Sequence, residues 1–236
     1  MYKLMRLMKR RKDFSPERFK EYWLTRRAPL ERRALGMAPI RRIVANIATG
    51  EVALGGTVPP FDGMLALFCD TRADLDAVLA GPVPAMLQED EANFVDADAK
   101  PVDMLADDVL VCQKSDAESR MKTSGQVKII RTVFCRSDLT MAQFRDYWLK
   151  EHAKLEDRVI RETPMLRIVA NFALPQASGK PPYDGMAELY FENVADIRAT
   201  MGGPVPAMMR KDEENFVQMD APAIRFIVEE HLIGEK

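Results

Sequence analysis

The chain repeats itself, and this internal duplication restricts the folds open to it more than any other feature. Residues 19–24 return as residues 144–149, and residues 42–46 return unchanged as residues 167–171, both at an offset of 125. A loop three residues longer in the first copy then lowers the offset to 122, at which three further blocks match: 60–64 with 182–186, 81–86 with 203–208, and 90–94 with 212–216. Five matched blocks in one order indicate two copies of a single module.

Each copy carries the predicted order strand, helix, strand, strand, helix, strand. In the second copy β-branched and apolar runs predict strands at residues 128–135, 166–172, 185–191 and 224–228. The first helix is expected to begin at Thr140, and its counterpart at Ser15, which precedes a proline. The second helix should begin at Asn193 or Asp196, bend at residues 202–206 and then resume, because proline and glycine interrupt a helix.

This element order is the split βαβ, ferredoxin-like arrangement, which covers one face of its sheet with helices and leaves the other bare. A bare apolar face needs a partner, and the sister repeat is the nearest one. The sequence therefore predicts an α+β fold in which two ferredoxin-like (βαββαβ) repeats form a pseudo-two-fold barrel. The expected organisation is repeat 1 at residues 1–113, a polar linker at 114–125 and repeat 2 at 126–236.

Composition excludes several classes of function. A formal net charge of −2 with scattered basic residues disfavours nucleic acid as a partner, and no apolar run approaches the roughly 18 residues of a membrane span. Without an uninterrupted apolar leader, a cytoplasmic location is expected. The three cysteines lack metal-ligand spacing and are expected to be buried thiols, and two histidines are few for a metal site. We therefore expect no metal and no tightly bound cofactor.

His152 is the first candidate for chemistry. Phe144, Trp148 and His152 fall at i, i+4 and i+8, so a 3.6-residue period places them on one helical stripe. The two aromatic residues are expected to pack on the sheet, whereas His152 is a candidate general base or substrate anchor, with a structural capping role as the alternative. The first copy has Arg27 at this position, so the two repeats differ where chemistry is expected.

Glu188 is the second candidate, on a strand where alternation places Met186 and Tyr190 on the same face. A carboxylate among apolar neighbours could orient His152 or have a raised pKa itself, and the alternative is an ordinary ion pair. The first copy has Ala66 at this position. One half therefore retains both polar residues, and the other has become scaffold or uses Arg27 to bind an anion.

Three further residues are weaker candidates. Arg131 lies in the middle of an apolar strand and is expected to project into the barrel, towards an anionic substrate or a carboxylate such as Asp212. Asn171 recurs as Asn46, which favours a structural role because the half without the histidine keeps it. His231, near the end of the last strand, is a second candidate histidine of lower rank.

The second copy carries the helix motif Phe-x2-Tyr-Trp-x3-His, the segment Tyr183-Asp-Gly followed by Glu188, and the helix end Asp212-Glu-x2-Phe. With these motifs it resembles the EthD domain family of the dimeric α+β barrel superfamily, and the resemblance extends over both halves of the chain. It is specific for the fold and weak for the reaction, because members include monooxygenases, decarboxylases, dehydratases, cyclases and isomerases. It implies a pocket shaped by Tyr147, Asn171 and Tyr183.

Two classes of function follow as hypotheses. The first is a small cytoplasmic enzyme of lyase or isomerase type, acting without a cofactor on an apolar aromatic or polyketide-like molecule in the barrel, with His152 as acid/base and Glu188 as its helper. Cofactor-free oxygenation is a further option implied by the family. The alternative is a non-catalytic binding protein for a hydrophobic small molecule or haem. The fused barrel is expected as a monomer or a homodimer.

Overall fold

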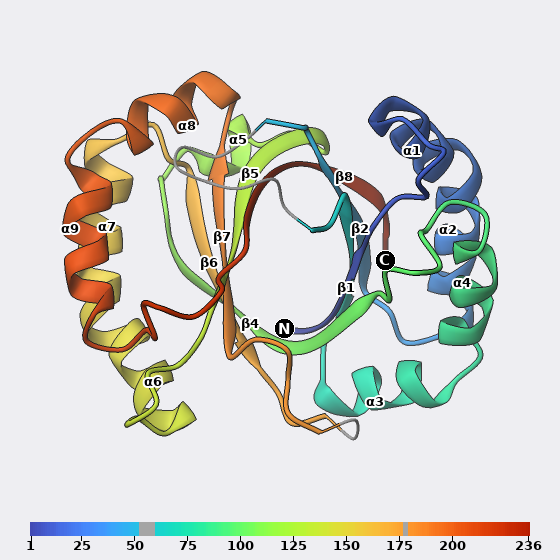
Figure 1. Cartoon of the computed structure of the whole chain (residues 1–236), viewed down its shortest axis with the longest axis horizontal. Coiled ribbons are helices and arrows are strands. Elements are labelled where there is room, and N and C mark those ends of the chain that lie inside the picture. Colours follow the sequence, from blue (N-terminus) through green and yellow to red (C-terminus); the bar gives the residue numbers. More distant parts are fainter. Residues whose placement is uncertain (52–59, 177–178) are drawn as a thin grey trace.

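The computed structural model describes residues 1–51, 60–176 and 179–236, and it contains one closed, eight-stranded antiparallel barrel (Figure 1). The order of strands around the barrel is β1-β3-β2-β8-β5-β7-β6-β4. The strands span Tyr2–Met8 (β1), Arg42–Ala48 (β2), Gly63–Cys69 (β3), Val102–Gln113 (β4), Ser124–Val133 (β5), Arg167–Ala173 (β6), Gly185–Phe191 (β7) and Arg225–Glu235 (β8). The expected fold is confirmed.

Each repeat contributes one four-stranded sheet, and two seams join the sheets. Repeat 1 supplies β4-β1-β3-β2 and repeat 2 supplies β8-β5-β7-β6. The last strand of each repeat crosses to the other, so that β4 pairs with β6 and β8 pairs with β2, both antiparallel. Closure removes all sheet edges, which explains why neither sheet needs a further strand.

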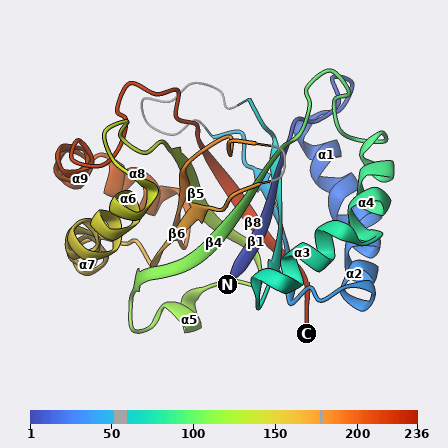
Figure 2. The ribbon, with the colours of Figure 1, turned by 90° about the horizontal axis from the view of Figure 1, so that it is seen from below.

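Helices cover the outer face of each sheet. Repeat 1 has α1 (Pro16–Tyr22), the π-helical η1 (Trp23–Arg27), α2 (Ala28–Met37), α3 (Arg72–Ala80) and α4 (Val83–Glu91). Repeat 2 has α6 (Met141–Tyr147), the π-helical η2 (Trp148–His152), α7 (Ala153–Glu162), α8 (Val194–Met201) and α9 (Val205–Glu213). The two helical layers lie on opposite sides of the barrel (Figure 2). Among the described residues, no helix combines the length and apolarity that a bilayer crossing requires.

The helix starts follow the sequence closely. Ser15, Thr140 and Asn193 each accept a hydrogen bond from the backbone N–H three residues on, which satisfies an otherwise unpaired donor of the first turn. Thr140 also forms a capping box with Gln143. The Gly-Pro-Val-Pro segment separates α8 from α9, and Pro204 stands at the N-cap position of α9. The expected capping residues therefore act as predicted, with Asn193 rather than Asp196 at the start of α8.

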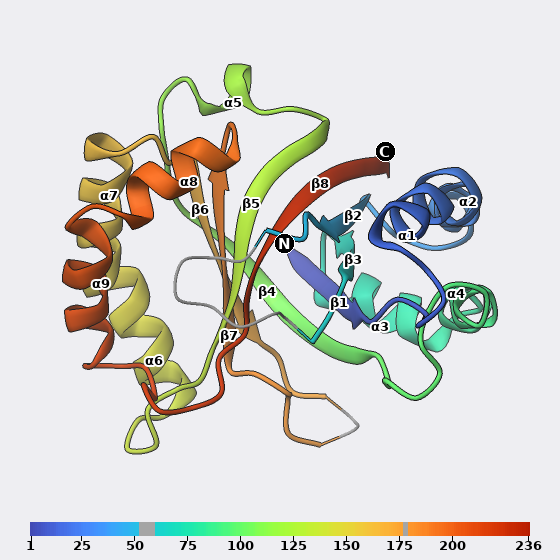
Figure 3. The same cartoon turned by 45° about the horizontal axis from the view of Figure 1, so that its top comes forward.

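Several segments extend beyond their expected bounds. The strand β5 begins at Ser124 and β8 continues to Glu235, because both pair along two neighbours when the barrel closes. The polar segment between the repeats contains a short helix, α5 (Ala117–Arg120), which lies beyond one end of the barrel (Figure 3). The three-residue insertion in the loop between β2 and β3 falls largely outside the described residues.

Buried side chains line the barrel lumen. One apolar cluster draws on β1, β3, β4, β5, β7 and β8: Met5, Leu7, Met64, Met104, Ala106, Ile130, Met186, Phe226 and Val228. Eight strands enclose an interior just wide enough for such packing. The methionines of this cluster belong to the core, and the expectation that a ligand lies within the barrel stays a prediction.

Candidate functional site

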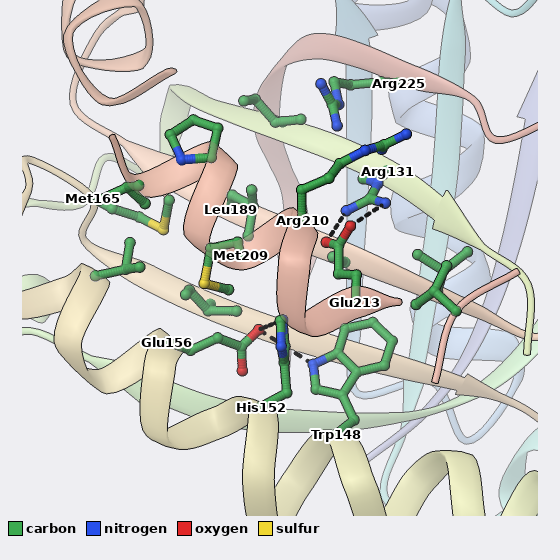
Figure 4. A pocket seen from close by; sticks show the side chains of 18 of the residues that line it. Arg131, Trp148, His152, Glu156, Met165, Leu189, Met209, Arg210, Glu213 and Arg225 are labelled. Carbon is green, nitrogen blue, oxygen red and sulfur yellow. Dashed lines mark hydrogen bonds and ion pairs between the residues drawn. The ribbon is translucent and has the colours of Figure 1, made fainter. Parts of the chain in front are cut away.

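A cavity of about 340 Å³ lies on the outer face of the second sheet, beneath η2, α7 and α9 (Figure 4). Its apolar walls come from the strands β5, β6 and β7 and from the covering helices, namely Ile129, Val133, Ile168, Ala187, Leu189, Trp148, Val159, Met165, Met201, Val205, Met209 and Phe216. Its polar lining is His152, Glu156, Arg131, Arg210, Glu213 and Arg225. An apolar cavity with a few convergent polar groups is the usual form of a small-molecule site.

The π-helical segment η2 brings the site residues to this cavity. Trp148 begins the segment and His152 ends it. The ring of Trp148 packs edge-on against Phe144 and Phe172, with centroid distances of 5.6 and 5.4 Å, which anchors the segment to the sheet. Single π turns within α-helices occur frequently at functional sites. The stripe predicted from the sequence is thus present, with His152 facing the cavity.

His152 is held in a defined orientation. Its Nδ1 atom lies 2.6 Å from Oδ2 of Asp212, near the end of α9, and the residue is 3% exposed. Burial lowers the pKa of His152 below its ordinary value, against the opposing effect of Asp212. A neutral imidazole at physiological pH donates its Nδ1 proton to the Asp212 carboxylate and leaves the Nε2 lone pair free.

Glu156 lies one turn further along the same stripe and faces the same cavity. Its Oε1 atom is 3.9 Å from Nε2 of His152 and accepts a hydrogen bond from the indole N–H of Trp148 at 3.2 Å. Its Oε2 atom is buried and has no hydrogen-bond partner among the described residues. Burial raises the pKa of Glu156 to about 8, so the carboxyl group is protonated at neutral pH. The sequence reasoning missed this residue.

Asp212 also binds Tyr147. The phenol O–H donates to Oδ1 of Asp212 at 3.0 Å, and its ring stacks on Phe216 at 5.2 Å. Tyr147 therefore supports the carboxylate that orients His152, rather than lining the cavity as expected.

Arg131 faces the helices and not the lumen. The alternation along β5 places it with Ile129 and Val133 on the outer face. There it makes a bidentate ion pair with Glu213 of α9, in which Nη2 of Arg131 lies 2.8 Å from Oε2 of Glu213. The expected carboxylate partner, Asp212, binds His152 instead. The expectation that Arg131 projects into the barrel is wrong, but its place beside an acid and a pocket is as expected.

Glu188, Asn171 and Tyr183 do not join His152. Glu188 accepts hydrogen bonds from Lys3 at 2.6 Å and from Asn171 at 3.0 Å, and it also pairs with Lys128. Burial alone would raise the pKa of Glu188, but the two ammonium groups hold it well below its ordinary value. Glu188 is therefore a neutralised, ionised carboxylate on the lumen face, and Asp212 takes the orienting role expected of it.

Asn171 and Tyr183 belong to the interior of the barrel. The Asn171 amide donates to the carbonyl of Met186 at 3.2 Å, and Asn46 donates to Met64 at 3.0 Å, which matches the expected structural role of the repeated asparagine. Tyr183 packs in the apolar lumen cluster, edge-on against Phe134. Neither residue lines the cavity.

His231 lies on β8 at the seam of the barrel. Its Nδ1 atom is 2.8 Å from the hydroxyl of Ser124, and its Nε2 atom is 3.5 Å from Glu229. Burial lowers the pKa of His231 as well. The two histidines of the chain therefore occupy separate environments, and only His152 lines the described cavity.

Repeat 1 fills the corresponding space with a guanidinium group. Arg27, at the position of His152, is fully buried and pairs with Glu31 at 3.0 Å and with Asp90 at 3.2 Å. It also reaches across to the carbonyl of Leu87 on α4. Leu87 matches Met209, which lines the cavity in repeat 2. The position that faces the cavity in repeat 2 thus carries a buried, ion-paired guanidinium group in repeat 1.

The fold and this site define a dimeric-type α+β barrel whose two halves are fused in one chain. The model of the EthD domain matches twice, at residues 11–98 and 136–220, and the chain therefore belongs to the EthD domain family. Among curated proteins, none matches the chain in sequence.

Solved structures share the fold at low sequence identity. An anthrone oxidase-like protein superimposes with a TM-score of 0.64 at 8% identity, covering 100% of this chain and 94% of its own. A candidate monooxygenase from Fusobacterium nucleatum has a TM-score of 0.58 at 6% identity, with 99% and 92% covered. A variant chlorite dismutase from Candidatus Nitrospira defluvii has a TM-score of 0.53 at 10% identity, with 96% and 90% covered. These likenesses show the fold alone.

Proposed function

We propose that the protein is an enzyme that binds an apolar, aromatic or polyketide-like small molecule in the cavity of repeat 2 and transfers a proton next to a carbonyl group. The observation that carries this proposal is the pair His152 and Glu156, which face one apolar cavity with their pKa values shifted in opposite directions. Two titratable groups with separated proton affinities are the arrangement that acid/base catalysis needs.

Each group has a definite role at neutral pH. Nε2 of neutral His152 takes a proton from a carbon next to the substrate carbonyl, or from one conjugated with it through an aromatic ring, and the electron pair of the C–H bond moves to the carbonyl oxygen as an enolate. Protonated Glu156 then gives its proton to that oxygen or to another carbon of the conjugated system. The imidazolium returns a proton to Glu156, directly or through solvent, so the cycle is balanced. Asp212 stabilises the imidazolium that forms during the cycle.

This step underlies isomerisation, cyclisation and dehydration, and it also produces the electron-rich enolate that reacts with dioxygen in cofactor-free oxygenation. In decarboxylation the same enolate forms by loss of carbon dioxide, and Glu156 would supply the proton that the product gains. The anthrone oxidase-like structure supports an aromatic ketone as the first compound to test. In anthrone the methylene protons are acidic through conjugation with the carbonyl. Their removal by His152 is the expected first event.

Haem is a poorer fit to this cavity. The Nε2 atom, which an iron would need, already faces the Glu156 carboxyl group at 3.9 Å, and the imidazole is almost fully buried. Coordination would require that carboxyl group to move into an apolar wall. Haem therefore has no part in the proposed mechanism.

The test measures hydrogen–deuterium exchange of a ketone substrate in the absence of oxygen. Anthrone is incubated in D₂O with the wild-type protein or with the variants His152→Ala and Glu188→Gln, and loss of the methylene signal is followed by proton NMR. We expect the wild type to accelerate exchange and His152→Ala to reduce the acceleration by about 10²-fold or more. Admission of air then shows whether anthraquinone forms.

The variant Glu188→Gln tests whether Glu188 assists His152, as the sequence alone suggested. Exchange at the wild-type rate per folded molecule is expected for it, since Glu188 lies outside the cavity. Anthrone bound equally by wild type and His152→Ala, with no exchange above the solvent rate, would contradict the enzyme proposal and favour a binding protein for hydrophobic molecules.

A further inference from the structure

One end of the cavity carries more positive charge than its own residues neutralise. Figure 4 shows Arg131, Arg210 and Arg225 towards the same end, away from His152 and Glu156. Glu213 is the carboxylate at this end of the cavity, and it pairs with Arg131. Three guanidinium groups against one carboxylate leave a surplus of two positive charges beside the apolar walls.

Repeat 1 shows that this surplus is specific to the pocket. At the matched positions Arg6 corresponds to Arg131, and Asp103 corresponds to Arg225. Arg6 pairs with Glu91 at 2.7 Å and with Asp103 at 2.7 Å, so its charge is doubly satisfied. In repeat 2 an arginine replaces the second of those acids.

Arg225 consequently stands opposite another arginine. It is the cross-strand partner of Arg131 in the register of β5 and β8. Like charges in directly opposed positions destabilise a sheet. Burial, and then the charges of Arg131 and Arg210, lower the pKa of Arg225, with Glu213 the opposing group. Among the residues described, no carboxylate lies within ion-pair distance of Arg225.

Arg210 adds a third cation from the helical side. It lies on α9, one turn before Glu213, and its counterpart in repeat 1 is the neutral Gln88. Its side chain is exposed and lines the cavity, and it has no ion-pair partner in the described parts of the chain. Two independent replacements, Asp by Arg and Gln by Arg, thus make the same end of one pocket more positive.

We propose that Arg225 and Arg210, supported by Arg131, bind the anionic group of the substrate, which is therefore an amphipathic acid. The planar guanidinium fork matches a carboxylate, which accepts two parallel hydrogen bonds. The apolar body of the acid lies against Leu189 and Met209, with its reacting carbon towards His152. This inference rests on the proposed function, because it names the substrate class of the same site.

The experiment compares carboxylates with uncharged counterparts of the same shape. The probes are 2-naphthoate, cinnamate and decanoate, each with its primary amide, and affinities are measured by calorimetry for the wild type and the double variant Arg210→Gln/Arg225→Asp. The variant carries the repeat 1 residues at both positions. The control Arg26→Gln/Arg33→Asp changes net charge equally by replacing two exposed arginines of repeat 1.

We expect at least one carboxylate to bind the wild type about tenfold or more tightly than its amide. The preference should vanish in Arg210→Gln/Arg225→Asp and persist in the charge control. No preference for any of the three acids, or a preference that survives in the double variant, would overturn the proposal. His152→Ala should keep the preference, so loss of catalysis and loss of anion binding are distinguishable.

A second measurement needs no ligand. In the single variant Arg225→Asp the new carboxylate would complete the ion pairs of Arg131, as Asp103 does for Arg6, so the substitution should raise Tm by about 2–4 °C. A fall in Tm would contradict the claim that Arg225 lacks a partner in the ligand-free protein.

Discussion

The two repeats share one fold and one buried Trp–Glu pair, yet only repeat 2 opens the described cavity beneath its helices. Trp23 donates to Glu31 and Trp148 donates to Glu156, at matched positions and at similar distances. The difference lies in the residue that stands between the tryptophan and the glutamate in each repeat. Arg27 ties Glu31 into an ion pair, whereas the shorter His152 leaves Glu156 without a cation and leaves volume beside it.

The pKa values of the two glutamates follow this difference. Burial raises the pKa of Glu31 to about 7, with Arg27 opposing the rise, and raises that of Glu156 to about 8. The same carboxyl group is thus part of a packed ion pair in one repeat and a proton donor facing a pocket in the other. The comparison shows that a change at the position of His152, together with a few changes around it, distinguishes a candidate site from a packed scaffold with the same fold.

The largest expected effect comes from making repeat 2 resemble repeat 1. In His152→Arg the guanidinium group should fill the cavity and pair with Glu156, removing the base and the space for substrate together. Turnover should fall by about 10²–10⁴-fold, and probe binding should be lost as well. His152→Ala, measured beside it by calorimetry, should lose turnover but retain binding. Equal probe binding by His152→Arg and His152→Ala would contradict the claim that an arginine at this position fills the cavity.

Removing the cation from repeat 1 should affect stability instead. Arg27→Met leaves Glu31 and Asp90 without their buried partner, which typically costs about 3–5 kcal/mol of the free energy of unfolding. Loss of the cation raises the pKa of Glu31 further above its value in the unfolded chain. The folded variant therefore loses stability as rising pH removes the proton from Glu31. Its destabilisation, measured by urea unfolding, should therefore be greater at pH 8 than at pH 5. Equal losses at both pH values would show that Glu31 does not respond to Arg27.

The pH profile sharpens the roles of the acid and the base. Activity should rise as His152 loses its proton below its ordinary pKa, and it should fall as Glu156 ionises at about pH 8. A carboxyl group with a raised folded-state pKa stabilises the protein below its unfolded value of about 4.5, and this stability is lost as pH rises through about 8. Glu156→Gln should remove that loss, gaining on the order of 4 kcal/mol relative to wild type between pH 5 and pH 9 in urea unfolding, because a difference of one pKa unit corresponds to about 1.4 kcal/mol. An unchanged alkaline limb of activity in this variant would exclude Glu156 as the acid.

The smallest effect is expected from the floor of the pocket. Ala187 lines the cavity, and repeat 1 has Leu65 at the matched position. Ala187→Leu should occupy part of the cavity and weaken probe binding by about tenfold or less. The free energy of unfolding should fall by at most about 3 kcal/mol. Unaltered affinity in calorimetry would place the ligand away from this wall.

The fold was accessible from the sequence because the duplication, the capping residues and the turn residues all agree. Ser15 and Thr140 act as N-caps, and the Gly-Pro-Val-Pro segment ends one helix and begins the next. The lengths of β5 and β8 were not accessible, because they depend on pairing across the seams, which no local pattern reports.

The site was accessible only in part. The helical stripe identified His152 and, continued by one turn, would have reached Glu156, but recurrence of the glutamate in both repeats gave no contrast between them. Glu188 faces the lumen, whereas His152 lies under the helices on the outer face of the same sheet, and the strand and helix patterns alone did not show that the sheet separates them. The sequence contrast between Arg225 and Asp103 was available, and its meaning appeared only once β8 was seen beside β5.

The central claim is that His152 is a neutral base facing the ligand, and NMR titration of the two histidines tests it most directly. The variant His231→Asn assigns the imidazole signals, and pH is varied with and without 2-naphthoate. The account predicts that His152 titrates below the ordinary histidine value of about 6.5 and that its signal shifts on addition of the acid. A pKa above that value, with a signal unmoved by saturating ligand, would contradict it.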